Sequence, residues 1–479
     1  MDTKTKTFIR NYAKALKENN AAIFAGSGLS KESGFVDWRG LLRHIAEDLH
    51  LDVDKEQDLV ALTQYHINEK GGNRSTINQA LLEEFTRGST KTENHKIIAS
   101  LPISTFWTTN YDKLIEEALC DEGKTPDIKV YQDDLSTNLP KRDAIVYKMH
   151  GDISHPSDVV ISKDDYEIYN LNRPLFSAAL QGDLVSKTFL FIGFSFNDPN
   201  LDQILGRIRV LLGKNLRQHY CFFKKVNRGD YDSDEDFQYN SIKQGLRIND
   251  LKRYAIEGIL VDDYSQIPQI LTNIRDSFRR NIVFISGSAD DYGEWGMDNA
   301  LKFVHALSYR LAAEDYKLVS GFGRGIGSTI INGCLEYVYS SQYRHLDSYL
   351  DLRPFPQIIT GKKPQETLWK EYRRDMISNA GIAIFLFGNK MDEDNKLIDA
   401  PGLQDEFEMA KELGLKIVPV GATGFVSEKL WKDIFNNYNH FYTGYSQLKT
   451  DFEILGSKEA NPDVLVNTIV KIVNILRGG

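Results

Sequence analysis

The sequence predicts an α/β fold with mainly parallel strands, and two observations support this fold class. Short apolar runs alternate with amphipathic helical stretches along most of the 479 residues, which is the pattern of strands joined by helical crossovers. The two halves of the chain each open with a strand that leads into a Gly-Ser turn. At about 150 residues per domain, a chain of this length is expected to form two or three units.

Six apolar runs of the first half are expected to form strands. Roughly eighty residues separate the first two runs, far more than a plain crossover needs. The interval from Trp38 to Leu101 is rich in helix formers, so we expect a helical insertion there. The expected strands are Ala21–Ala25, Thr105–Thr109, Ile145–Lys148, Thr188–Phe194, Tyr220–Phe223 and Gly258–Val261.

A second series of strands begins after the basic segment Ser277–Asn281. No Pro- or Ser-rich linker precedes it, so the restart of the strand, Gly-Ser turn and helix pattern defines the boundary. We therefore expect one domain over residues 1–280 and a second over residues 281–479. The expected strands of the second domain are Ile282–Ser286, Lys317–Ser320, Ile382–Phe387 and Lys416–Val420.

Composition argues against several classes of partner. The net charge of −9 argues against nucleic acid, which needs a concentrated basic surface. The three cysteines, Cys120, Cys221 and Cys334, lie too far apart for a zinc knuckle, and we expect no metal. No stretch of about 18 apolar residues is present and the first twenty residues lack a signal-peptide pattern, so we expect a cytoplasmic protein without a membrane partner.

A glycine-rich turn follows the first expected strand. The segment AAIFAGSGLS places Gly26, Ser27, Gly28 and Ser30 between a buried strand and a helix. Glycines at this position let backbone N–H groups approach a pyrophosphate at a helix N-terminus. The alternative is a tight turn that needs glycine only for packing.

Polar residues also follow three other strands of the first half. FWTTNYDKL brings Asn110 and Asp112, YKMHGD brings His150, Gly151 and Asp152, and FLFIGFSFNDPNL brings Gly193, Ser195 and Asp198. In an open parallel sheet the carboxyl ends of the strands form the ligand crevice, so we expect these residues to meet there.

These motifs resemble those of the sirtuins. The similar segments are Gly26–Ser30 (the GAGxS loop), Asp37–Arg39 (the end of PDFR), Thr109–Asp112 (QNxD), Met149–Gly151 (the LHG of the catalytic histidine) and Gly193–Ser195 (GTS). The resemblance implies an N-terminal Rossmann-like sirtuin domain that binds NAD. Carried over by position, it implies NAD contacts from Ala25, Gly26, Ser27, Ser30, Asp37, Asp112, Gly193 and Ser195.

Departures from the sirtuin pattern narrow the expected reaction. The four-cysteine zinc module cannot be built from this sequence, and Thr109 stands where the family has glutamine. These losses concern the protein substrate, whereas the NAD motifs remain, so the interpretation is an NAD hydrolase rather than a deacylase. We expect Asn110 to hold a ribose hydroxyl or a water and His150 to accept its proton. The alternatives are a helix N-cap for Asn110 and a structural hydrogen-bonding role for His150.

The second half carries a further glycine-rich loop and several charged residues. IVFISGSA gives Gly287 and Ser288, and KLVSGFGRGIGS gives Gly323 and Gly325, a pattern typical of a phosphate cradle or of a purely structural turn. Cations to contact phosphates and a carboxylate to contact hydroxyls would complete a nucleotide site. The candidates are Arg373, Arg374, Lys390 and Glu406, with Glu406 expected to begin a helix; the alternative for each is a solvated helix face.

This half resembles the SLOG group of Rossmann-like nucleotide sensors, although the PGGxGTxxE signature of its enzymes is replaced by Pro401–Gln404. A sirtuin-like domain followed by a SLOG domain resembles the NAD-degrading effectors of bacterial Thoeris antiphage defence. That resemblance implies a cyclic ADP-ribose isomer as activator, a TIR-domain enzyme that produces it, and a homo-oligomer, either a tetramer or a filament. The implied effector contacts are Gly287, Ser288, Gly323, Gly325, Arg373, Lys390 and Glu406.

Two other functions fit the sequence. A zinc-free NAD-dependent deacylase would use NAD only with an acylated peptide, and a non-catalytic sensor would bind nucleotides without turning them over.

Overall fold

The computed structural model describes residues 1–196, 198–342, 345–356 and 363–478. The chain divides into two compact units, Met1–Arg275 and Asp276–Gly479. The division falls inside one continuous helix, α14 (Ile267–Arg279). The α/β fold class with parallel sheets is confirmed, since each unit is built around a parallel sheet.

The first unit contains a seven-stranded sheet of order β3-β4-β2-β1-β5-β6-β7. After β1 the chain builds the sheet to one side and then returns to add β5 on the other, so the switch point lies between β1 and β5. The strands are β1 (Ala21–Ala25), β2 (Thr105–Thr108), β3 (Pro126–Lys129), β4 (Ala144–Lys148), β5 (Thr188–Ile192), β6 (His219–Lys224) and β7 (Ile256–Val261).

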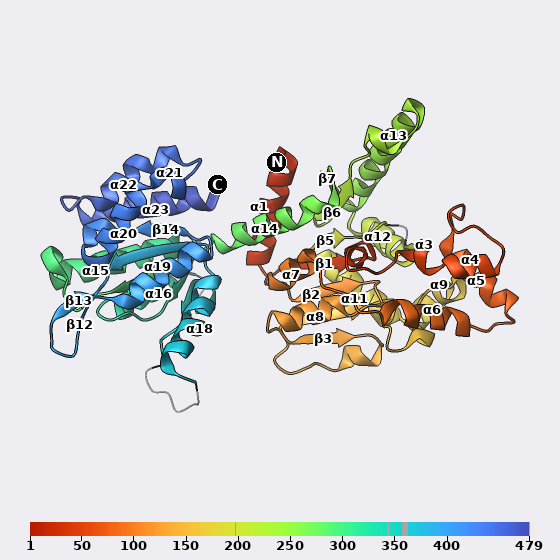
Figure 1. Cartoon of the computed structure of the whole chain (residues 1–479), viewed down its shortest axis with the longest axis horizontal. Helices are drawn as coiled ribbons and strands as arrows, with labels where there is room; N and C mark the ends of the chain where they lie inside the picture. Colours follow the sequence, from red (N-terminus) through yellow and green to blue (C-terminus); the bar gives the residue numbers. More distant parts are fainter. Residues whose placement is uncertain (197, 343–344, 357–362, 479) are drawn as a thin grey trace. The chain divides into compact units, whose positions relative to one another are not determined.

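Helices surround this sheet (Figure 1). Five of them, α3 to α7, fill the interval from Trp38 to Leu101 and confirm the predicted helical insertion. The helices are α1 (Thr3–Lys17), α2 (Gly28–Lys31), α3 (Trp38–Leu41), α4 (Arg43–Asp48), α5 (Leu59–Glu69), α6 (Ser75–Phe85), α7 (Glu93–Ser100), α8 (Leu114–Asp121), α9 (Lys163–Glu167), α10 (Tyr169–Asn172), α11 (Pro174–Ser186), α12 (Pro199–Leu212), α13 (Asp234–Leu251) and α14.

The second unit contains a five-stranded sheet of order β10-β9-β8-β11-β14 and a separate hairpin. Its switch point lies between β8 and β11, in the same relation to the first strand of the unit as in the N-terminal sheet. The strands are β8 (Ile282–Ser288), β9 (Lys317–Ser320), β10 (Leu350–Leu352), β11 (Ile382–Phe387) and β14 (Lys416–Pro419), with β12 (Asn389–Met391) and β13 (Leu397–Asp399) in the hairpin.

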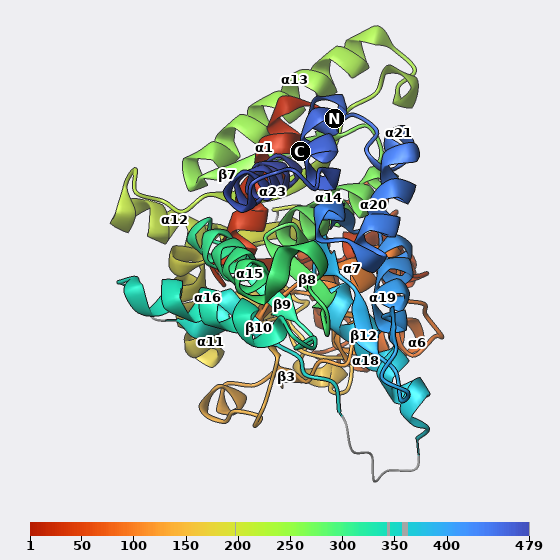
Figure 2. The ribbon, with the colours of Figure 1, turned by 90° about the vertical axis from the view of Figure 1, so that its left-hand side faces the viewer.

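Helices of the second unit cover both faces of its sheet. Helices α20 and α23 lie above the strands and α18 lies below them in both views (Figures 1 and 2). The helices are α15 (Gly296–Ala313), α16 (Gly327–Ser340), α17 (Leu346–Tyr349), α18 (Gln365–Ser378), α19 (Pro401–Glu412), α20 (Phe425–Asn436), α21 (Tyr438–Phe441), α22 (Lys449–Gly456) and α23 (Pro462–Gly478).

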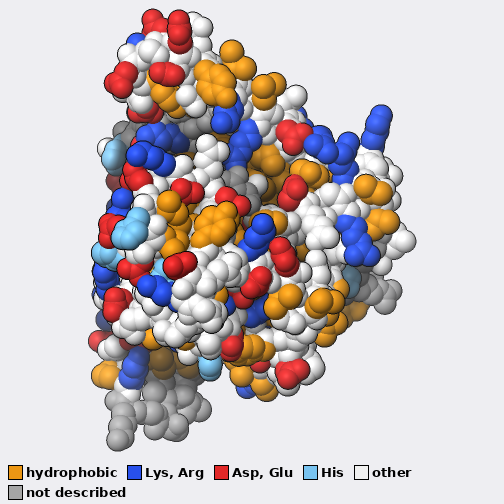
Figure 3. Space-filling view, turned by 90° about the vertical axis from the view of Figure 1, so that its right-hand side faces the viewer, with side chains coloured by type: hydrophobic (Ala, Val, Ile, Leu, Met, Phe, Trp, Pro, Cys, Tyr) orange, Lys and Arg blue, Asp and Glu red, His pale blue; other side chains and the backbone are white. Residues whose placement is uncertain are grey.

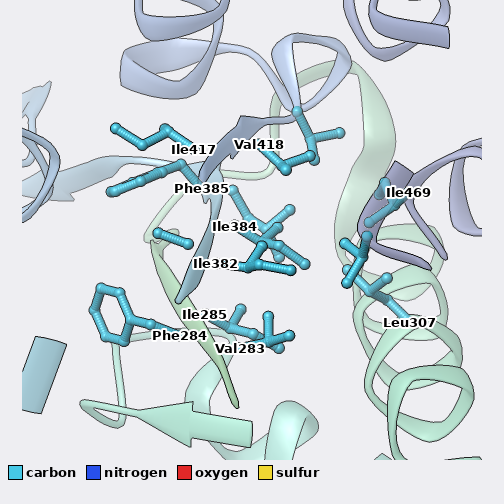
Figure 4. Close-up of a cluster of buried hydrophobic side chains, with 14 of the residues drawn as sticks. Val283, Phe284, Ile285, Leu307, Ile382, Ile384, Phe385, Ile417, Val418 and Ile469 are labelled. Atoms are coloured by element: carbon cyan, nitrogen blue, oxygen red, sulfur yellow. The ribbon is translucent and has the colours of Figure 1, made fainter. Parts of the chain in front are cut away.

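Side-chain alternation along the strands builds two core layers in the second unit. Figure 4 shows Ile285 and Ile384 facing Leu307 of α15 and Ile469 of α23, whereas Phe385 lies on the opposite side of the sheet. There the ring of Phe385 packs on Phe407 of α19, with centroids 5.9 Å apart. Both faces of the central strands are therefore buried, as the continuous apolar sequence of β11 predicts.

The structure corrects several predicted strand bounds. The strand expected at Thr188–Phe194 ends at Ile192 because Gly193 takes a left-handed φ of +63°. Four strands were not predicted: the edge strands β3 and β10, and both strands of the β12–β13 hairpin. These strands are three or four residues long, and short edge strands carry little hydrophobic periodicity.

Charged side chains of both signs lie on the face of the molecule that Figure 3 displays. Acidic and basic side chains are interspersed there, and neither kind forms the whole surface. In the described part of the chain, no helix has both the length and the apolar character needed to cross a membrane.

Truncating the core of the second sheet is expected to destabilise the protein. Ile384 is fully buried in the central strand β11, so Ile384→Ala removes buried methyl groups and leaves a cavity. We expect a loss of about 3 kcal/mol in the free energy of unfolding, measured by urea denaturation of the intact chain. The control is Ile398→Ala, because Ile398 is 37% exposed on the hairpin and should change stability by less than about 0.5 kcal/mol. Equal losses for the two variants would contradict this prediction.

Candidate active site

Two loops meet backbone to backbone at the switch point of the first sheet. The amide of Gly28 donates to the carbonyl of Gly193 over 2.9 Å, and the amide of Gly26 donates to Ile192 over 2.9 Å. A Cβ on Gly193 would lie 2.1 Å from the backbone nitrogen of Leu29. Glycine is therefore required at this contact, which packs the loop after β1 against the loop after β5.

Asn110 lies directly beside the glycine loop. Its side-chain amide Nδ2 donates to the carbonyl of Gly26 over 3.1 Å and to the hydroxyl of Ser30 over 3.0 Å. These bonds fix the orientation of the amide, and its oxygen Oδ1 is buried without a hydrogen-bond partner among the described residues. A buried acceptor held ready in this way is suited to a ribose hydroxyl or a water.

His150 follows β4 and is 2% exposed. Its Nε2 lies 3.2 Å from Oδ2 of Asp198, but the angles do not make a hydrogen bond, and Nε2 has no other hydrogen-bond partner in the part of the chain that is described. The rings of Tyr166 and Tyr169 stand edge-on to the imidazole, with centroids 5.4 and 6.1 Å away.

The electrostatic surroundings keep His150 neutral. Burial lowers the pKa of the imidazole below its usual value, and the nearby carboxylate of Asp198 opposes this effect only in part. A neutral imidazole at pH 7 can accept a proton, as a general base must.

Other predicted NAD contacts divide into those that join this site and those that do not. Ser30 donates its hydroxyl to Asp112 over 2.7 Å, and the carbonyl of Ala25 accepts the hydroxyl of Thr108 over 3.1 Å. Asp37, by contrast, caps α3 through the amide of Gly40. That hydrogen bond lowers the pKa of the Asp37 carboxyl, which also pairs with Lys31 over 3.0 Å.

The two remaining serines of the set lie at the surface. Ser27 is exposed and makes no capping hydrogen bond to α2. Ser195 is also exposed, and its carbonyl accepts a hydrogen bond from Arg247. No described contact joins either side chain to Asn110 or His150, so their roles stay predictions.

Two charged residues contribute to this site, of which the sequence placed Asp198 at the sheet edge and did not single out Lys148. Asp198 caps α12 by accepting from the amide of Leu201 over 2.9 Å, and its second carboxylate oxygen faces His150. The contact with His150 was not predicted, because the Asp-Pro pair at the start of α12 signals only the start of a helix. Lys148 is fully buried at the end of β4, and a lysine inside an apolar strand was the available signal.

A second group of glycine and polar residues lies at the carboxyl ends of β8, β9 and β11 in the C-terminal sheet. A Cβ on Gly323 would lie 1.9 Å from the carbonyl oxygen of Gly287, and one on Gly325 would lie 1.9 Å from that of Ala289. Ser288 donates its hydroxyl to the carbonyl of Asn389 over 3.1 Å. The predicted glycine loop is thus packed against the end of β8, beside the strand that carries Lys390.

Arg373 and Glu406 meet beside this loop. Nε of Arg373 lies 3.5 Å from Glu406, and Glu406 accepts the hydroxyl of Ser286 over 2.6 Å. Burial raises the pKa of the Glu406 carboxyl, while Ser286 and Arg373 act in the opposite direction. Arg373 also stacks on the ring of Phe355 with its guanidinium carbon 5.0 Å from the centroid.

One expectation for the charged residues is wrong. Glu406 does not begin a helix, because α19 starts at Pro401 and places Glu406 in its middle. Arg373 lies in the second half of α18, which leads into β11. The alternative of a solvated helix face fails for Arg373 and Glu406, whose side chains are 14% and 12% exposed, but holds for Arg374 at 56%.

Asn389 is a further residue that the sequence analysis missed. Its side chain is fully buried, accepts from the amides of Asp290 and Asp291 over 3.0 and 2.9 Å, and donates to the carbonyl of Asp291 over 2.7 Å. It thereby shapes the loop after β8. Over the described residues, no group of three or more His, Cys, Asp and Glu side chains is arranged to hold a metal ion.

Fold and sites together define a class of protein. Both units are Rossmann-like, and in each a glycine-rich loop and polar side chains lie at the carboxyl ends of the strands, where nucleotides bind in such folds. The family models agree: a SIR2-like domain matches residues 104–248, and the Sir2- and TIR-associating SLOG family matches residues 266–476.

The full length of the chain has named relatives. It is 49% identical to the NAD(+) hydrolase ThsA of Cytobacillus dafuensis, over 100% of this chain and 98% of the relative. It is 48% identical to the NAD(+) hydrolase ThsA of Bacillus cereus (strain MSX-D12) and 45% identical to that of Acinetobacter baumannii (strain 532279), over 98% or more of each chain. The chain belongs to the ThsA family of NAD(+) hydrolases, which confirms the resemblance read from its motifs.

Replacing Asp198 is expected to move the titration of His150. Because the carboxylate favours the imidazolium, Asp198→Asn should lower the pKa of His150 further, while asparagine still caps α12. The measurement is a pH titration of ¹³C-labelled histidine followed by NMR, with the His150 signal assigned by its loss in His150→Ala. An unchanged or raised pKa in Asp198→Asn would show that the carboxylate does not act on this ring.

Proposed function

We propose that this chain hydrolyses NAD at the carboxyl ends of β1, β2, β4 and β5, with Asn110 and His150 as its catalytic residues. The observation that carries the proposal is that two buried polar atoms at the carboxyl ends of the strands lack hydrogen-bond partners in the described structure: Oδ1 of Asn110, and Nε2 of His150, which faces the Asp198 carboxylate without a hydrogen bond. A buried polar atom without a hydrogen-bond partner lowers the stability of a protein. At the carboxyl ends of the strands of a parallel sheet, such atoms indicate a bound ligand. The family membership supports NAD as that ligand.

The proposed reaction needs orientation more than covalent help. The bond between the anomeric carbon of ribose and the pyridinium nitrogen breaks, and its electron pair stays on nicotinamide, which leaves as a neutral molecule. Water then bonds to the anomeric carbon, and His150 accepts the proton that this water loses. Asn110 holds the water or a ribose hydroxyl through Oδ1, while its amide stays fixed by Gly26 and Ser30.

We further propose that the second unit controls this activity by binding a cyclic ADP-ribose isomer made by a TIR-domain enzyme. The carboxyl ends of β8, β9 and β11 offer a glycine loop for phosphates, the guanidinium of Arg373, and the Glu406 carboxyl for a hydroxyl. The same proposal places the chain in a homo-oligomer, a tetramer or a filament, that depletes NAD during antiphage defence.

Control by a ligand is a physical requirement of such a reaction. An enzyme that destroys NAD without restraint would kill its own cell, so the active state must be rare before the signal arrives. Shifting a population from 1:99 to 99:1 needs a ligand that binds the active state about 10⁴-fold more tightly. A crevice with buried charges supplies contacts that can differ between two states.

Nicotinamide release tests the proposed reaction. The purified chain is incubated with NAD, with and without cyclic ADP-ribose isomers, and nicotinamide is measured by chromatography. We expect release in wild type and a loss on the order of 100-fold or more in Asn110→Ala and in His150→Ala. Release that requires an acylated peptide would indicate a deacylase. No release under any condition would indicate a sensor, and persistent release in His150→Ala would overturn its assignment as the base.

A matched pair of arginines on α18 tests the proposed control. Arg373→Ala should abolish activation by cyclic ADP-ribose isomers, because it removes the guanidinium beside the glycine loop. Arg374→Ala is the control, since Arg374 is 56% exposed and pairs with Glu412. The measurement is the activator concentration that gives half-maximal nicotinamide release, together with the NAD affinity of each variant. An Arg373→Ala variant that responds at wild-type concentrations would contradict the assigned site.

A further inference from the structure

A buried lysine lies directly under the candidate active site. Lys148 is the last residue of β4, is 0% exposed, and pairs in register with Thr108 of β2. Taking an ammonium group out of water is expensive unless partners replace its hydration. The contacts of the Lys148 ammonium therefore indicate what this buried residue does in the structure.

Lys148 has a complete set of partners. Its Nζ donates to the carbonyls of Asp112 and Tyr111 over 2.5 and 3.2 Å and to the carboxylate of Asp152 over 2.5 Å. Oε1 of Glu116 lies 3.0 Å away. An ammonium group has three N–H donors, so two backbone carbonyls and one carboxylate use all of them. We name these five residues the Lys148 cluster.

These contacts connect the two loops that carry the catalytic candidates. Asp152 and Lys148 close a five-residue loop whose central residue is His150, and the amide of Gly151 donates to the carbonyl of Lys148 over 3.1 Å within it. The carbonyls of Tyr111 and Asp112 belong to the loop that begins with Asn110. A single ammonium group thus joins the backbone of one loop to the side chain of the other.

The cluster favours the charged lysine. Burial acts against the ammonium, but Glu116 and Asp152 outweigh it and raise the pKa of Lys148 above its usual value. Lys148 therefore keeps all three donors at neutral pH, and the connection between the loops persists over the range in which His150 is neutral.

We propose that Lys148 is a positioning residue for NAD hydrolysis, because its ammonium sets the distance and orientation between Asn110 and His150. The inference rests on the proposed reaction at this site. Lys148 is buried behind the loops and acts through the backbone of Tyr111 and Asp112 and through Asp152. Displacement of a catalytic group by about 1 Å can lower the rate by on the order of 100-fold. The contacts of Lys148, which tether the two loops to each other, are therefore expected to affect the rate of NAD hydrolysis strongly.

The neighbouring strand β3 offers a matched control. Lys129 is also buried, with its side chain 4% exposed, and it pairs with Asp127 over 2.8 Å. Its remaining partner is the carbonyl of Thr137, over 2.5 Å. Neither Asp127 nor Thr137 belongs to a loop that carries Asn110 or His150. A lysine-to-methionine change at this position removes a buried ion pair from the same sheet without touching the proposed tether.

The experiment compares Lys148→Met with Lys129→Met in the full chain. Methionine keeps most of the side-chain volume and removes the donors. Nicotinamide release gives kcat and KM for NAD, thermal melting gives Tm, and the NMR signal of the His150 imidazole reports its environment without turnover. We expect both variants to have a lower Tm than wild type. Only Lys148→Met is expected to have a lower kcat, by on the order of 100-fold, while its KM for NAD changes less than about threefold. The NMR signal of His150 is expected to shift in Lys148→Met and not in Lys129→Met.

A triple variant distinguishes the loss of the contacts between the loops from the loss of a buried counter-charge. Lys148→Met alone leaves the Glu116 and Asp152 carboxylates without their counter-charge, and the added changes Glu116→Gln and Asp152→Asn remove these carboxylates. Tm should therefore recover in part, while kcat stays low because the contacts between the loops are still absent. Recovery of kcat in the triple variant, or equal kcat losses in Lys129→Met and Lys148→Met, would overturn the proposal. So would a failure of both Lys148 variants to fold, which would assign the residue to stability alone. Absence of nicotinamide release from wild type would instead refute the proposed reaction. In that case an unshifted His150 signal in Lys148→Met would also refute the positioning of His150 by Lys148.

Discussion

The close approach of two glycine backbones at the carboxyl ends of neighbouring strands is the constraint on which the rest of each unit depends. In the first sheet Gly28 donates directly to Gly193, and no side chain fits between the loops after β1 and β5. In the second sheet Gly323, in the loop after β9, lies against the carbonyl of Gly287 at the end of β8. Both contacts pack the loop after one strand against the end of a neighbouring strand, at the edge of the sheet where polar residues follow the strands.

Buried charge is the second feature that the two units share. Beside the first crevice, the ammonium of Lys148 lies among the Asp152 and Glu116 carboxylates, and beside the second, Glu406 lies between Ser286 and Arg373. Isolated charges in such positions would be strongly destabilising, whereas paired ones are tolerated and have a fixed geometry. A ligand entering either crevice therefore meets groups that are already oriented, which lowers the cost of ordering them on binding.

Much of the fold and part of the site could be read from the sequence because strand and motif signals are local. The apolar run of β1, its Gly-Ser turn and the helical stretch up to Leu101 gave correct elements. The edge strand β10 gave no signal, since it is three residues long. The sequence allowed Asn110 to be either a ligand contact or the N-cap of a helix. In the structure α8 begins only at Leu114, and the side-chain amide of Asn110 donates to the carbonyl of Gly26.

The sequence by itself determined the fold class, the family and the identity of the residues at the strand ends, because each depends on short segments of fixed spacing. Only the tertiary structure decided which of those residues meet. It brought Ser30 to Asp112 across 82 positions of sequence and Ser286 to Glu406 across 120, and it left Ser27 and Ser195 at the surface. It also showed Lys148 and Asp198 as partners of the loops that carry Asn110 and His150. Such contacts depend on strand order and on burial, and neither is encoded in the spacing of a motif.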